Sequence, residues 1–217
     1  MRPPRPLLVT GFEPFGGDDI NPSGEVARAL HGRTLAGVPV IGIVLPCLFG
    51  ASIEALRTAI DAHRPQLALA LGLAADREGF TLERIAINVD DARIPDNAGA
   101  QPIDRPVVPR GPAAYFTTLP IKAMVVALRD AGWPASVSQT AGTFVCNHLF
   151  YGLQHLSARR RGMRSGFMHL PCLSQQAHEQ ALPHPLPLQV MIEGVAMALL
   201  AAMNARADLA VTGGQIA

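Results

Sequence analysis

Short apolar runs alternate with helix-like patterns along almost the whole chain, and this alternation limits the fold more than any other feature. Continuous apolar runs are typical of strands buried on both faces, whereas apolar residues at i, i+3, i+4 and i+7 indicate helices with one buried face. Alternating strands and helices favour a largely parallel sheet covered on both faces. No repeat, linker or boundary interrupts the pattern, so we expect one α/β domain over residues 1–217.

The period of each segment predicts the individual elements. Strands are expected over residues 6–10 (stopping at Gly11), 38–44, 66–71, 81–89, 135–140 and 166–170. Helices are expected to begin at Pro22, with Asn21 as the N-cap, and to cover residues 51–63, 120–131, 144–159 and 188–204. In segment 81–89 one side is apolar and the other carries Glu83, which is typical of a half-exposed strand.

The charge balance argues against a nucleic-acid binder. Eighteen Lys and Arg residues face 17 Asp and Glu, giving a formal net charge of +1, whereas binding to phosphates needs clustered basic charge. The one local basic cluster follows an apolar helical pattern, which is typical of a solvated helix end; it comprises Arg159, Arg160, Arg161 and Arg164. With 49% hydrophobic residues the chain can build a sizeable core.

The termini and the cysteines indicate a reducing compartment. The first residues lack the apolar core and cleavage site of a secretory signal, and the most apolar segment, 186–203, is too interrupted to span a membrane. The chain has only three cysteines, Cys47, Cys146 and Cys172. Their odd number and the lack of C-x-x-C spacing argue against a disulfide framework and a zinc site. We therefore expect a cytoplasmic protein with free thiols and no membrane contact.

Cys146 is a candidate nucleophile because of its place after a strand and at the start of a helix. If Thr143 is the N-cap, Cys146 is the third residue of that helix, where free backbone N–H groups and the helix dipole lower the pKa of a thiol. The same amides could hold an oxyanion. The alternative is a small buried hydrophobe facing the sheet, the more common fate of a single cysteine.

A cysteine nucleophile needs a base, and His169 stands apart among the seven histidines. It lies at the carboxyl end of the strand entered after the Cys146 helix, where a right-handed βαβ unit brings neighbouring strand ends together. His148 is two residues from Cys146 on the same helix and faces away, and His155 is also on the opposite side. The alternative for His169 is a hydrogen-bonded histidine at a strand end without a catalytic role.

The residue patterns leave the partner of the histidine open. Any of four carboxylates is a possible orienting group: Glu83, Asp90, Asp91 and Asp96. Arg93 is either an oxyanion-binding or substrate-positioning cation or one half of a surface salt bridge.

Two loops have compositions that indicate function. Residues 11–18 follow a strand and precede a helix, but they lack the Lys and Ser/Thr of a phosphate-binding loop and include Glu13. Phe12 and Phe15 instead favour an apolar or flat, neutral ligand, with hinge packing as the alternative. Residues 90–111 are too long for a turn and form either a functional loop or an oligomer contact.

Several long motifs in one order give the chain a family resemblance over residues 7–204. They read TGFEPFGG with NPS, ERIAINVDDARIPDNAG, GPAAYF with LPIK, TAGTFVCNHLFYGL and GFMHLP. The chain resembles the pyroglutamyl peptidase type I, or pyrrolidone-carboxylate peptidase, family of cysteine peptidases. The resemblance implies an α/β/α sandwich, usually a homotetramer, that removes an amino-terminal pyroglutamyl residue from peptides.

The resemblance also implies roles for individual residues. The catalytic glutamate, nucleophile and histidine of the family fall on Glu83, Cys146 and His169. The lactam-stacking aromatic residues of the family fall on Phe12 and Phe15, and its oxyanion-side arginine falls on Arg93. Further pocket residues fall on Phe144 and Val145.

Four positions depart from the family pattern. Residues 72–77 read GLAADR where members commonly read GQAGGR, so Leu73 replaces a lactam-contacting glutamine and Asp76 replaces a glycine. Cys47 stands where Thr is frequent, and Gly24 where Trp is usual. With the catalytic trio unchanged, we expect an active enzyme with an altered pocket.

We therefore expect a cysteine omega-peptidase that acts through a thioester and needs no metal or organic cofactor. Its partners are expected to be peptides with an N-terminal pyroglutamate and further copies of the chain, as a tetramer or a dimer. Two other functions are compatible with the residues: a ligand-binding pseudoenzyme, and a cysteine amidohydrolase for another small cyclic or acyl substrate.

Overall fold

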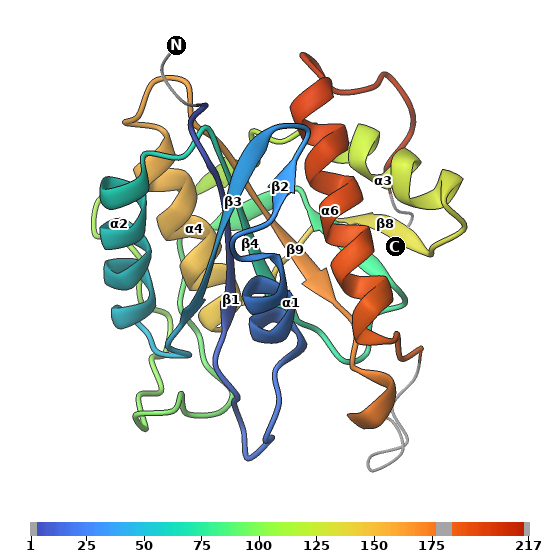
Figure 1. Cartoon of the computed structure of the whole chain (residues 1–217). Helices are drawn as coiled ribbons and strands as arrows, with labels where there is room; N and C mark the ends of the chain where they lie inside the picture. Colours follow the sequence, from blue (N-terminus) through green and yellow to red (C-terminus); the bar gives the residue numbers. More distant parts are fainter. Residues whose placement is uncertain (1–3, 177–183, 215–217) are drawn as a thin grey trace.

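A seven-stranded sheet forms the centre of the molecule in the computed structural model, which describes residues 4–176 and 184–214 (Figure 1). The strand order is β2-β3-β1-β4-β9-β5-β8. The strands are β1 (Leu7–Phe12), β2 (Thr34–Leu35), β3 (Val38–Leu45), β4 (Leu67–Leu73), β5 (Phe80–Glu83), β8 (Ala135–Ser138) and β9 (Arg164–Leu170). Strands β3, β1, β4 and β9 are parallel, so their carboxyl ends meet at one edge, toward the bottom of Figure 1.

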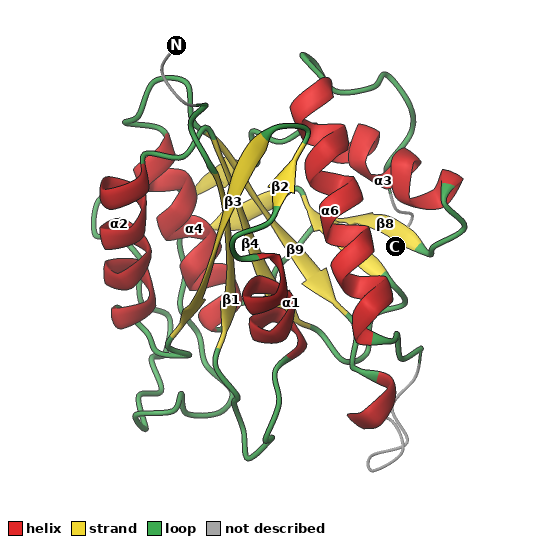
Figure 2. Ribbon diagram, viewed as in Figure 1, coloured by secondary structure: helices red, strands yellow, loops and turns green. Residues whose placement is uncertain are grey.

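Helices cover both faces of this sheet and complete a three-layer α/β/α sandwich (Figure 2). The helices α2 (Ala51–His63) and α4 (Val145–Ser157) pack together on one face. The other face is covered by α1 (Pro22–Leu30), α3 (Ile121–Asp130) and α6 (Leu188–Asn204). The expected fold class is thus confirmed. No helix in the described part of the chain combines the length and apolarity needed to cross a membrane.

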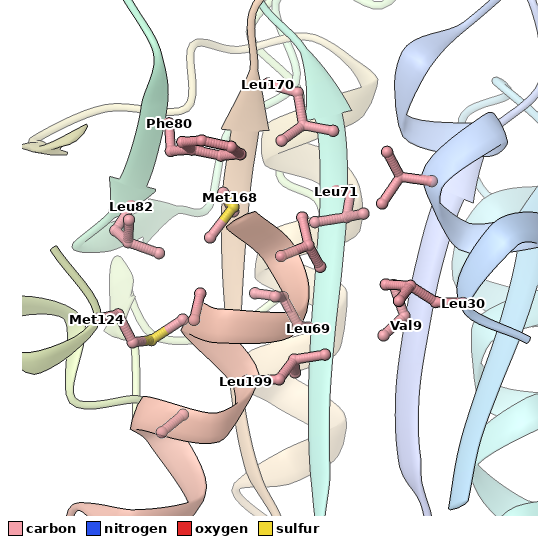
Figure 3. Packing of buried hydrophobic residues seen from close by; sticks show 14 of the residues in the cluster. Val9, Leu30, Leu69, Leu71, Phe80, Leu82, Met124, Met168, Leu170 and Leu199 are labelled. Atoms are coloured by element: carbon pink, nitrogen blue, oxygen red, sulfur yellow. The ribbon is translucent and has the colours of Figure 1, made fainter. Parts of the chain in front are cut away.

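The layers meet in two apolar clusters, one on each side of the sheet. Figure 3 shows the cluster beneath α1, α3 and α6, where Leu69, Met168 and Leu199 lie among the side chains that join strands to helices. Each fully buried Leu, Met or Phe side chain contributes about 1.5–3 kcal/mol. This packing on both faces fixes the positions of the strand ends, where the candidate site residues lie.

Several predicted elements are confirmed with their end signals. The side chain of Asn21 accepts a hydrogen bond from the Ser23 N–H, and Pro22 is the first residue of α1. Helices α2 and α6 have the predicted bounds. The prediction that β1 stops at Gly11 was wrong, because the strand continues to Phe12. Gly11 is required by close packing instead: a Cβ there would lie 1.9 Å from the Ser23 carbonyl oxygen of α1.

The prediction of one half-exposed strand over residues 81–89 was also wrong. The chain leaves the large sheet after Glu83, and the next residues form β6 (Ile85–Ile87), which pairs antiparallel with β7 (Ala114–Phe116) in a separate two-stranded sheet. Neither this second sheet nor the short β2 was predicted. All four residues of β5 are buried, because β5 lies between β9 and β8. Glu83 is therefore not on an exposed polar face: its exposed fraction is 0%.

Candidate active site

His169 and Glu83 form a buried pair on the neighbouring strands β9 and β5. The His169 Nδ1 lies 2.7 Å from the Glu83 Oε1, and the exposed fractions of the two residues are 4% and 0%. Because an ionised carboxylate only accepts hydrogen bonds, Nδ1 is the donor in this pair, and Nε2 is the ring nitrogen left to exchange a proton with another group. Of the four carboxylates left open by the sequence, the structure thus pairs Glu83 with His169.

Cys146 is the second residue of α4, not the third. The N-cap is Phe144, in an extended conformation and without a side-chain capping bond. The prediction of Thr143 as the cap was wrong, because its hydroxyl donates to the Asp91 carbonyl oxygen at 2.7 Å and so joins the helix start to another loop. The first backbone N–H groups of α4, including that of Cys146, remain without a capping side chain.

The Cys146 thiol lies against the strand pair that carries His169. A Cβ placed on Gly72 would lie 2.8 Å from the Cys146 Sγ and 2.8 Å from the Phe167 ring, and Gly72 is the residue opposite His169 in the β4–β9 register. The rings of Phe167 and His169 are 4.9 Å apart. Within the described residues the thiol makes no hydrogen bond, a common state of catalytic groups in ligand-free enzymes.

The prediction that a right-handed βαβ unit brings Cys146 and His169 together was wrong. The β8–α4–β9 segment is not a parallel βαβ unit: β5 separates β8 from β9, and both β5 and β8 run antiparallel to β9. The short segment over residues 139–144 connects β8 to α4, whose Cys146 lies beside Gly72 near the carboxyl end of β4. Cys146 and His169 therefore both lie beside Gly72: the thiol packs against it, and His169 is its register partner on β9.

Burial raises the pKa of the Cys146 thiol, and the nearby Cys47 and Glu83 raise it further. This differs from the expected lowering by the helix N-terminus. The physical cause is that the sulfur lies among apolar side chains and near a buried carboxylate, both of which disfavour a thiolate. Cys146 therefore remains a thiol until a base removes its proton.

A cavity of about 500 Å³ opens beside Cys146 and is walled mainly by apolar and aromatic side chains. Every residue predicted to bind substrate lines it: Phe12, Phe15, Leu73, Arg93, Phe144 and Val145. The Phe15 and Phe144 rings are 5.2 Å apart, and Phe49 meets Phe144 edge-on at 5.4 Å, which braces the wall from behind. Such a cavity suits a small, flat and mostly apolar group.

A family model described as pyroglutamyl peptidase matches residues 5–205. The chain belongs to the pyroglutamyl peptidase family. The pyrrolidone-carboxylate peptidase of Escherichia fergusonii is 52% identical over 208 residues, covering 96% of this chain and 97% of that protein. Its counterpart from Yersinia pestis (strain Pestoides F) is 50% identical over 213 residues, covering 98% of this chain and 99% of that protein. The crystal structure of pyroglutamyl peptidase I from Bacillus amyloliquefaciens matches with a TM-score of 0.93 and 40% identity, covering 96% of this chain and all of that chain.

The segment that departs from the pyroglutamyl peptidase pattern keeps an ordinary backbone. Leu73 is the last residue of β4 and faces the cavity, and Ala74 donates its N–H to the Leu170 carbonyl oxygen at 2.9 Å. Asp76 is not among the described residues with positive φ, so the replacement of a glycine there causes no left-handed strain. At Gly24, a further departure, a Cβ would lie 2.4 Å from the Phe12 carbonyl oxygen, so a larger side chain here would require the backbone to shift.

A second buried histidine–carboxylate pair lies on the far side of α4 from the thiol. The His148 Nδ1 lies 2.8 Å from the Asp90 Oδ2, and its Nε2 accepts the Gly50 N–H at 2.8 Å. Both ring nitrogens are therefore occupied, so His148 has no free nitrogen for proton transfer. His155 pairs with the Tyr115 hydroxyl at 2.8 Å, whereas His178 lies outside the described residues.

The first part of the loop over residues 90–111 belongs to the cavity wall. Arg93 and Ile94 line it, and within the described residues Arg93 makes no ion pair with Asp90, Asp91 or Asp96. The Asp96 carboxylate accepts the N–H groups of Phe49, Ala98 and Ala100 at 2.8–2.9 Å. Burial would raise the pKa of Asp96, but these backbone N–H groups outweigh it and hold that pKa below its ordinary value.

Sequence reasoning missed two supporting residues. Arg77 lies 3.7 Å from the Glu83 Oε1. Glu13 Oε1 accepts the Cys47 N–H and the Asn97 side-chain amide at 3.1 and 3.0 Å, so it joins three loops around the cavity. Arg77 could have been noticed as a cation shortly before Glu83, but no local pattern indicates the contacts of Glu13.

Proposed function

We propose that this member of the pyroglutamyl peptidase family hydrolyses the bond between an N-terminal pyroglutamyl residue and the next residue of a peptide, with Cys146 as nucleophile. The observation that carries the proposal is the meeting of three features at one sheet edge: the His169–Glu83 pair, the Cys146 thiol and the aromatic cavity. Together they supply a base, a nucleophile and a binding site.

His169 activates the thiol. Since burial disfavours an isolated thiolate, the proton of Cys146 leaves as the sulfur attacks, and the Nε2 of His169 accepts it. The buried Glu83 carboxylate stabilises the imidazolium that forms and keeps the ring oriented. His169 then gives the proton to the leaving amine, the C–N bond breaks, and a thioester to Cys146 remains. Water, deprotonated by His169, hydrolyses the thioester and releases pyroglutamate.

Backbone and side-chain donors receive the charge that develops on the carbonyl oxygen. The uncapped N-terminus of α4 presents the Cys146 N–H, and Arg93 supplies a cation from the lining of the same cavity. Removal of one such donor in other enzymes costs about 10²- to 10³-fold in rate.

The cavity favours a neutral lactam over an open-chain residue. Its walls include Phe12, Phe15 and Phe144, against which a flat ring can stack. An N-terminal glutamine or glutamate would bring a charged ammonium group into this apolar space at a large desolvation cost. Cyclisation removes that charge.

We further expect the protein to act as one domain over residues 1–217, in the cytoplasm, where the reactive thiol stays reduced. We expect it to assemble as a homotetramer or a homodimer. The proposed steps use only side chains and backbone groups of the chain and require no metal or organic cofactor.

The test is the turnover of a pyroglutamyl anilide, with and without prior treatment by a thiol alkylator. The proposal requires turnover that the alkylator abolishes and that the Cys146→Ala variant lacks while its circular dichroism spectrum is unchanged. Binding of pyroglutamyl peptide without turnover would instead indicate a pseudoenzyme. Turnover of other small acyl substrates, with none of the anilide, would indicate a different amidohydrolase.

A further inference from the structure

The buried Glu83 carboxylate has fewer hydrogen bonds than a buried charge requires. Its Oε1 is close to the His169 Nδ1, whereas its Oε2 is fully buried and has no hydrogen-bond partner among the described residues. A buried carboxylate with one unpaired oxygen is costly unless a cation compensates it; otherwise it takes up a proton.

Arg77 is the compensating cation. Its guanidinium nitrogen lies 3.7 Å from the Glu83 Oε1, and in the described part of the chain no other Lys or Arg is within ion-pair distance of this carboxylate. The other titratable groups that face Glu83 are His169 from β9 and Cys146 from α4, and neither carries the permanent positive charge of a guanidinium. Strand β8 contributes Ser138, the residue beside Glu83 in the register, which carries no charge.

The guanidinium is held in place from two sides. Arg77 donates from its side chain to the Thr140 carbonyl oxygen at 3.1 Å and from its backbone to the Ala74 carbonyl oxygen at 3.0 Å. Its side chain is 29% exposed, and it is not among the residues that line the cavity. Arg77 can therefore influence the reaction through Glu83 without touching the substrate.

We propose that Arg77 is a positioning residue that keeps Glu83 ionised and thereby keeps His169 oriented for proton transfer. This inference rests on the proposed function, because it assigns Arg77 a role only through Glu83 and His169. Loss of the guanidinium lets Glu83 take up a proton, and a neutral carboxyl no longer stabilises the imidazolium. The rate of turnover falls while substrate binding in the cavity is retained.

The experiment is a double-mutant cycle between Arg77→Gln and Glu83→Gln, with pH profiles of kcat and KM. Arg77→Gln is expected to lower kcat by about 10- to 100-fold, the range of strongly coupled neighbours, with little change in KM. The acidic limb of its kcat/KM profile moves to higher pH by about one unit, the effect of losing one opposite charge. The control Arg57→Gln removes an exposed ion pair with Glu54 on α2. It should leave both kcat and the acidic limb of the kcat/KM profile unchanged.

The cycle distinguishes a failure of this inference from a failure of the proposed function. In the Glu83→Gln background, Arg77→Gln should cause no further loss of kcat. An equal loss of kcat in the wild-type and Glu83→Gln backgrounds would mean that Arg77 acts only through Thr140, and the inference would be wrong. Full activity of Glu83→Gln would overturn the catalytic assignment itself. If Arg77→Gln failed to fold, Arg77→Lys would replace it as the test. Because lysine keeps the charge, the acidic limb of the kcat/KM profile must stay at the wild-type pH, and a displaced limb would overturn the inference.

Discussion

The chemistry of the site depends on how differently the structure treats residues of the same type. Burial raises the pKa of the Cys47 thiol to about 12, with the carboxylates of Glu13 and Asp96 adding to the effect. The charged neighbours of Cys47 are these two carboxylates, whereas Cys146 packs against the strand pair that carries His169. We therefore expect the two thiols to differ in reactivity.

The first prediction concerns the three thiols. Iodoacetamide should modify Cys146 fastest, because His169 lies nearby as a base, and Cys146→Ser should lose almost all turnover while the fold survives. Peptide mass spectrometry after brief alkylation identifies the modified residue, and Cys47→Ser and Cys172→Ser serve as controls that keep the chemistry. Faster labelling at Cys47 than at Cys146 would contradict the assignment.

The second prediction separates His169 from His148. His169→Ala should reduce kcat by about two to four orders of magnitude, the usual contribution of a positioned acid–base group. His148→Ala should reduce kcat far less, because both ring nitrogens of His148 already bind Asp90 and Gly50. Steady-state kinetics on both variants, with thermal unfolding to check the fold, would expose an error if the two effects were reversed.

The third prediction concerns Leu73, where the pyroglutamyl peptidase pattern commonly has glutamine. If that side chain contacts the lactam, Leu73→Gln restores one hydrogen bond worth about 0.5–1.5 kcal/mol, or about 2- to 12-fold in kcat/KM. We expect this modest gain, because Leu73 faces the cavity from the end of β4. An unchanged kcat/KM would show that only the backbone matters here, whereas a complete loss of turnover would mean a cavity reshaped for another substrate.

Among the elements, the loop over residues 90–111 depends most on a single side chain. Asp96 ties it to the loop before α2 through the Phe49 N–H and caps its own turn through the N–H groups of Ala98 and Ala100. These bonds hold the part of the loop that bears Arg93 against the cavity.

The fourth prediction follows from the lowered pKa of Asp96. A carboxyl whose pKa is lower in the folded state contributes stability above its ordinary value of 3.8, and this contribution disappears as the pH falls through the folded-state pKa. Asp96→Asn should therefore lower the free energy of unfolding by about 1–3 kcal/mol at neutral pH, the cost of weakening charged hydrogen bonds. Urea titrations at pH 7 and below pH 3 measure this. A difference that persisted undiminished at the lower pH would refute the charge-based explanation.

For the molecule as a whole, the sequence predicted what local patterns determine. The helices α2 and α6 and the Asn21 cap were found because apolar spacing and capping residues act over a few positions. Cys146 and His169 were likewise singled out by their places at a helix start and a strand end.

What the sequence could not predict is decided by contacts between distant segments. The pattern over residues 81–89 does not reveal that Glu83 ends a central antiparallel strand while Ile85 begins another sheet, because strand order depends on long-range pairing. The choice of Glu83 among four carboxylates came from family resemblance, and the contact with His169 is visible only in the fold. Thr143 looked like a cap because its distant partner, the Asp91 carbonyl, is not encoded nearby.

A methyl group at position 72 would lie 2.8 Å from the sulfur of Cys146 and 2.8 Å from the Phe167 ring, so the thiol has room here because residue 72 lacks a side chain. The thiol lines the cavity, so a substrate carbonyl that enters the cavity reaches the sulfur from that side, with its ring beside the aromatic walls. Approach within an asymmetric cavity brings one face of the carbonyl toward the sulfur. We therefore expect a substrate and its mirror image to differ in turnover.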